Sequence, residues 1–151
     1  MIGLRLFAVL LLTGLNAFFV AAEFSLVAMR ASRVRQLIEE GHSAARVVQW
    51  LQADLDRVLS GVQLGITFAS LGLGYVGQTT FAALFQNALS WMPSTQALLV
   101  ANTAAVVLAF SLITFLHVVL GELVPKSLAL QTTERLALLV ARPLHWFITV
   151  F

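Results

Sequence analysis

Residues 121–126 read Gly-Glu-Leu-Val-Pro-Lys and follow a long apolar run, so an acid, a proline and a lysine meet at one point. A carboxylate at membrane depth costs about 2.5–3.5 kcal/mol on insertion scales, which makes Glu122 a functional candidate. Pro125 lacks an N–H, and its ring clashes with the carbonyl of Gly121 four residues earlier, so this carbonyl loses its helical partner. A freed carbonyl beside a carboxylate indicates a cation site.

A simpler interpretation of the same residues is a helix that surfaces here. Glu122 and Lys126 would then form an i,i+4 ion pair worth about 0.2–0.5 kcal/mol at the membrane interface. The residues alone leave both interpretations open.

The composition identifies an integral membrane protein. Hydrophobic residues make up 60% of the chain and charged residues 11%, and the mean hydropathy is +0.92, far from the roughly 25% charged residues of a soluble domain. There is no cysteine, which excludes disulfides, thiolate metal sites and cysteine nucleophiles. The net charge of +2 is small and its arginines cluster near helix ends, so it indicates topology and not nucleic-acid binding.

The first expected span covers residues 4–29, and the arginines that follow it (Arg30, Arg33 and Arg35) predict a cytoplasmic C-terminal end and an N-terminus outside. Asn16, Glu23 and Ser25 interrupt its apolar pattern. Interhelical hydrogen bonding is the ordinary explanation of Asn16 and Ser25. Residues 31–59 carry too many charges for a span and predict two amphipathic helices on the cytoplasmic surface, separated by Gly41.

Two further spans are expected at residues 60–89 and 97–120, joined by an outside turn at residues 91–94. Glycines in the first of them predict close helix packing, with the Ser70 hydroxyl available to a ligand. In the second, His117 is a possible ligand or proton carrier, although hydrogen bonding alone is the favoured interpretation. Residues 127–151 contain Arg142 and Pro143 and predict an interfacial helix rather than a fourth span. The chain ends inside an apolar segment, so we expect it to be part of a longer protein.

Motifs for enzyme chemistry are missing from the sequence, including HExxH, GxSxG and the P-loop. The remaining chemistry is a set of oxygen donors on three spans: Ser25 with Glu23, Ser70, and Glu122 with the Gly121 carbonyl. These are hard ligands suited to Mg²⁺, Ca²⁺ or Na⁺. A single carboxylate among neutral oxygens favours weak, releasable binding, which transport requires.

Three separated motifs resemble the transmembrane domain of the CNNM/CorC magnesium transporters, in the bacterial CorC branch. They are residues 16–30 (NAFFVAAEFSLVAMR), residues 60–67 (SGVQLGIT) with 69–72 (ASLG), and residues 121–126 (GELVPK). The resemblance covers nearly the whole chain. It implies an all-α membrane domain of three spans, with a pair of short cytoplasmic helices after the first span and a C-terminal juxtamembrane helix.

The resemblance also implies a function. It implies a homodimer in the bacterial inner membrane that exports Mg²⁺ with coupling to Na⁺, and a metal site built from Ser25, Ser70, Gly121 and Glu122. Family members normally continue into CBS modules that bind ATP and a small C-terminal domain, both absent from this chain. A second hypothesis is a membrane-anchored Mg²⁺ sensor or scaffold that regulates another transporter through the same ligands.

Overall fold

The computed structural model describes residues 2–89 and 95–151, without the side chains of residues 88, 89 and 95–98. Helix α1 (Ile2–Ala28) forms the first span, and α4 (Leu55–Leu89) forms the second. The third is continuous from α5 (Thr95–Leu116) through the π-helical segment η1 (His117–Leu123) into α6 (Val124–Gln131). Three stretches are long and apolar enough to cross a membrane: Ile2–Ala28, Leu55–Asn87 and Leu99–Gln131. The predicted all-helical fold with three spans is confirmed, and the turn expected at residues 91–94 lies outside the described residues.

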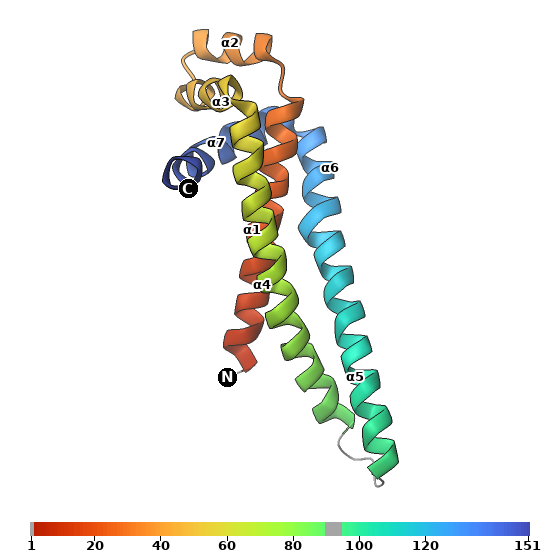
Figure 1. The fold of residues 1–151 in the computed structure, drawn as a ribbon. Helices are drawn as coiled ribbons and strands as arrows, with labels where there is room; N and C mark the ends of the chain where they lie inside the picture. Colours follow the sequence, from red (N-terminus) through yellow and green to blue (C-terminus); the bar gives the residue numbers. More distant parts are fainter. Residues whose placement is uncertain (1, 90–94) are drawn as a thin grey trace.

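The two predicted amphipathic helices are α2 (Ala31–Glu39) and α3 (Ser43–Ala53), and the predicted juxtamembrane helix is α7 (Thr133–Val150). Gly41 separates α2 from α3 with a φ of +89°, a left-handed conformation that glycine adopts without strain. Figure 1 shows α2, α3 and α7 gathered at one end of the spans, which we call the α2–α3 end.

Two predicted boundaries differ from the structure. The second span starts at Leu55 rather than near residue 60, because the Asp54 carboxylate accepts the backbone N–H of Arg57 (3.3 Å) at the start of the new helix. The third span continues to Gln131 rather than ending near residue 120. Lys126 does not end it, since its ammonium lies 4.4 Å from the centre of the Phe24 ring on α1.

The main hydrophobic core lies where α1, α2, α3, α4 and α7 meet. Its fully buried side chains include Leu26, Leu37, Leu51, Val62 and Leu144, one from each of these helices. Burying a leucine of this kind is worth about 1.5–3 kcal/mol. This core fixes α2, α3 and α7 against the spans at the α2–α3 end.

Close packing explains two glycines of α4, as predicted. A Cβ atom at Gly65 would come within 2.5 Å of the Phe19 ring on α1, and one at Gly61 would overlap Ile148 on α7. The GxxxG pair formed by these two glycines therefore packs against two different helices rather than one.

A charge-assisted contact joins α2 to the start of α7. The Arg33 guanidinium donates two hydrogen bonds to the Glu134 carboxylate, through Nε (2.8 Å) and Nη2 (3.1 Å). Arg33 Nη1 also lies 3.8 Å from Glu40 Oε1. The hydrogen bond from Arg33 holds the pKa of the Glu134 carboxyl below its usual value.

Candidate ion-binding site

The third span widens where Pro125 removes a backbone donor. Because Pro125 has no N–H, the Gly121 carbonyl cannot form the usual bond to the residue four positions later. The backbone forms the π-helical segment η1, and the N–H of Val124 donates to the carbonyl of Val119, five residues earlier. Figure 1 shows α5 and α6 continuing in nearly the same direction across this segment, so the carbonyl is freed by a wide turn rather than a sharp kink.

The freed Gly121 carbonyl accepts a hydrogen bond from the side chain of Asn16 on α1. The Asn16 Nδ2 to Gly121 oxygen distance is 3.0 Å, and Asn16 is 1% exposed. A Cβ atom at residue 121 would lie 2.9 Å from Asn16 Nδ2 and 3.0 Å from a His117 ring carbon. Glycine therefore lets α1 approach the third span closely enough for this bond.

Asn16 also contacts the second span. The Ser70 hydroxyl on α4 donates to Asn16 Oδ1 (3.2 Å), and Ser70 Oγ lies 3.1 Å from His117 Nε2. One buried amide thus links all three spans, and η1 contributes both ends of the network, at Gly121 and at His117. We call the group Asn16, Ser70, His117 and Gly121 the polar network.

The Gly121 carbonyl fixes the direction of every hydrogen bond in the polar network. A carbonyl only accepts, so the Asn16 NH₂ must face it and the Asn16 oxygen must face Ser70. Ser70 therefore donates its single proton to Asn16, and His117 must donate from Nε2 to the Ser70 oxygen. This assignment leaves a lone pair on Ser70 Oγ and a second one on the Gly121 oxygen, both available to a cation.

Two of the four predicted ligands, Ser70 and Gly121, are brought together by Asn16. Ser25 is not part of this group. It lies nine residues after Asn16, about 13.5 Å further along α1 toward the α2–α3 end. Its buried hydroxyl donates to the Ala22 carbonyl of the same helix (3.3 Å), and Ser25 makes no interhelical hydrogen bond with any residue that the structure describes.

The fourth predicted ligand, Glu122, is exposed on η1 directly after Gly121. The alternative pair with Lys126 is not formed, since no ion pair of Glu122 occurs among the described residues and Lys126 lies over Phe24 instead. Within the same residues, no three His, Asp or Glu side chains form a metal-binding group. A cation here would be held mainly by neutral oxygens with one carboxylate nearby.

Sequence reasoning missed the central position of Asn16. Its polarity within an apolar span correctly indicated an interhelical hydrogen bond, and His117 lies within hydrogen-bond distance of Ser70, as favoured. The pattern within each span does not say which residues face each other across helices. The proline that frees Gly121 was the one available signal for the partner of Asn16.

The three spans, with amphipathic helices at one end and a polar network inside, define an integral membrane domain. Residues 6–151 match the family described as the cyclin M (CNNM) transmembrane N-terminal domain. The chain belongs to this family.

Related proteins occur in several bacteria. The chain is 42% identical to the UPF0053 protein YugS of Bacillus subtilis over 97% of this chain and 34% of the relative. It is 45% identical to the UPF0053 protein YhdT of the same species, over 90% of this chain and 29% of the relative. It is also 42% identical to the uncharacterized protein Rv1841c of Mycobacterium tuberculosis, over 89% of this chain and 37% of the relative. The chain thus spans about a third of the length of these curated relatives.

Proposed function

We propose that this chain is the membrane domain of a Mg²⁺ transporter that moves Mg²⁺ out of the cytoplasm. The observation that carries the proposal is the polar network, which gathers oxygen donors from three spans beside a backbone carbonyl freed by Pro125. Polar groups inside a span are costly, and besides forming interhelical hydrogen bonds they can line a substrate or ion route.

The donors suit a hard divalent cation. The Ser70 hydroxyl and the Gly121 carbonyl each keep a lone pair, and Glu122, the next residue after Gly121, supplies a negative charge. Ser25 lies closer to the α2–α3 end and would meet the ion before or after these ligands. One carboxylate does not neutralise a divalent ion, so binding is weak enough for release.

The direction of Mg²⁺ transport, its coupling ion and the oligomeric state of the domain are part of the same proposal. The arginines of α2 and α3 favour a cytoplasmic location for these helices and an N-terminus outside, and we assign the domain to the bacterial inner membrane. Na⁺ uses the same oxygen ligands and is the coupling ion, and the domain works as a homodimer. ATP binding would belong to CBS modules outside this chain.

The test is Mg²⁺ flux through the purified chain in liposomes that contain a fluorescent Mg²⁺ indicator. We expect Mg²⁺ to move down an imposed gradient, and faster when Na⁺ is supplied on the opposite side. Binding of Mg²⁺ by titration without any flux would support a sensor or scaffold instead. Absence of both binding and flux would overturn the proposed function.

A further inference from the structure

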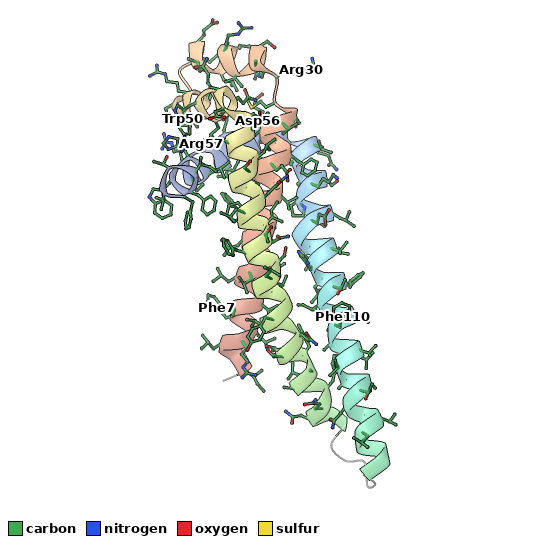
Figure 2. The ribbon with its side chains drawn as sticks, viewed as in Figure 1. Phe7, Arg30, Trp50, Asp56, Arg57 and Phe110 are labelled. Atoms are coloured by element: carbon green, nitrogen blue, oxygen red, sulfur yellow. The ribbon has the colours of Figure 1, made fainter. Side chains whose placement is uncertain are left out.

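A cavity of about 210 Å³ lies between α4 and the third span, next to the polar network. Its wall includes Gly74 and Gln78 from α4, and Phe110, Thr114 and His117 from the third span. His117 belongs to both the cavity and the polar network. Figure 2 places Phe110 on α5, well away from the α2–α3 end, so the cavity extends from the network toward the opposite side of the molecule.

The polar residues of the cavity continue those of the network. On α4, Ser70, Gly74 and Gln78 are four residues apart and lie along one side of the helix. Gln78 is eight residues beyond Ser70, which is about 12 Å along the axis. On the third span, Thr114 lies one turn before His117. A polar surface thus runs from the network toward the end opposite α2 and α3.

The polar atoms of Gln78 and Thr114 are free. Within the described part of the chain, neither side chain makes a hydrogen bond, and both are exposed. Other span threonines behave differently, since Thr13, Thr67 and Thr103 each donate to the carbonyl four residues earlier. Unsatisfied polar groups are expensive in hydrocarbon, so such side chains face protein or a water-filled space. A volume of about 210 Å³ admits several waters, because one water takes up about 30 Å³ in the liquid.

We propose that this cavity is the outer section of the ion path. Hydrated Mg²⁺ passes through it between the polar network and the side opposite α2 and α3. The Gln78 amide oxygen and the Thr114 hydroxyl accept hydrogen bonds from the waters around the Mg²⁺ ion, in place of some bulk waters. Leu73, Phe110 and Ile113 line the rest of the cavity, so Gln78 and Thr114 are two polar points on a largely apolar wall. Mg²⁺ gives up its waters reluctantly, so a passage with few ligands and enough room for bound water fits this ion. This inference rests on the proposed transport function.

The first test asks whether the cavity holds water. Because the chain contains no cysteine, a single introduced cysteine is the only reactive thiol in the protein. Gln78→Cys and Thr114→Cys should react with a charged, membrane-impermeant thiol reagent added from the outside. Phe68→Cys and Leu108→Cys are the controls, since both side chains are at least 50% exposed but do not line the cavity. Equal, low reactivity at all four positions would show that lipid fills the cavity and would overturn the proposal.

The second test fills the cavity from Gly74. A Cβ atom at Gly74 meets nothing within 4 Å, so a side chain can start there without a clash at its first carbon. We expect Gly74→Phe to lower Mg²⁺ flux in liposomes about tenfold or more by blocking the passage, while Mg²⁺ binding measured by titration stays unchanged. Gly74→Ala, which adds one methyl group, should fold normally and lower flux less.

Gly14→Phe is the matched control, because a Cβ atom there also meets nothing within 4 Å and Gly14 does not line the cavity. It should leave flux and binding unchanged. Wild-type flux in Gly74→Phe would overturn the passage but not the transport function. Absence of flux in the wild-type chain would contradict the transport function itself, and the passage with it.

Discussion

Glu122 is the residue that most directly tests the metal site. Glu122→Gln keeps the shape and hydrogen-bonding capacity of the side chain but removes the one carboxylate beside Gly121. If Glu122 is a ligand, Mg²⁺ affinity should fall more than tenfold, or by over about 1.4 kcal/mol. Isothermal titration of the purified protein measures this change.

Lys126→Ala is the control for Glu122→Gln. Lys126 lies over the Phe24 ring rather than beside Glu122, so its removal should cost about 0.5–1 kcal/mol of stability and leave Mg²⁺ binding in place. Near-normal Mg²⁺ affinity in an intact Glu122→Gln protein would remove Glu122 from the site.

Asn16 holds the polar network together, and its replacement should affect both stability and binding. Asn16→Leu has a similar volume but leaves the Gly121 carbonyl and the Ser70 hydroxyl without their shared partner. We expect a loss of about 1–2 kcal/mol of stability, seen as a lower thermal midpoint in detergent, together with weaker Mg²⁺ binding. Asn102→Leu, at an exposed position on α5, is the matched control. Equal midpoints and equal affinities in the two variants would contradict a central role for Asn16.

At the residue scale, the sequence predicted which groups are unusual but not where their atoms point. Pro125 identified the freed Gly121 carbonyl, because the missing N–H is a local property of the chain. Ser25 was grouped with Ser70 as an oxygen donor within a span and through the family resemblance, and its role as a ligand stays a prediction. In the structure its hydroxyl donates to the Ala22 carbonyl of its own helix, and its level along α1 relative to α4 depends on packing between the helices.

At the scale of the elements, the contact between α2 and α7 should depend on pH. The hydrogen bond from Arg33 lowers the pKa of Glu134 in the folded protein below the ordinary 4.5. The contribution of this hydrogen bond to the stability of the α2–α7 contact is therefore complete above about pH 4.5. It is lost as the pH falls through the lowered pKa. Spin labels at Arg35→Cys and Leu139→Cys should report a broader distance distribution at pH 3 than at pH 7.

The control variants for this contact change one carboxylate at a time. Glu134→Gln removes the titrating partner, so its distance distribution should no longer change with pH. Glu39→Gln alters an exposed carboxylate of α2 that forms no ion pair among the described residues, and it should behave as the wild type. A pH response that persists in Glu134→Gln would assign the effect to another group.

The helices themselves were predictable, because hydrophobic periodicity and charge density are local. The charges of residues 31–59 separated α2 and α3 from the spans, and Gly41 gave the break between them. The end of the third span was not predictable in this way. The span was expected to end near residue 120, but the helix continues to Gln131, and the ammonium of Lys126 lies over the Phe24 ring of α1.

At the scale of the whole molecule, the arrangement of polar groups supports a route across the bundle. Ser25 lies nearest the α2–α3 end, the polar network follows, and Gln78 and Thr114 line the cavity beyond it. Each group presents neutral oxygens, so an ion would meet several weak sites in succession rather than one strong site. Weak sites in series favour release as well as entry.

The orientation of this route determines whether Mg²⁺ is exported, and single cysteines can establish it. Arg46 on α3 and Gln86 near the far end of α4 are exposed at opposite ends of the molecule. The arginines of α2 and α3 predict a cytoplasmic α2–α3 end. A membrane-impermeant maleimide added to intact cells should therefore label Gln86→Cys, and should label Arg46→Cys only after permeabilisation. Labelling of both cysteines from one side would contradict the three-span topology, and the reverse pattern would place the polar route in the opposite direction and contradict export.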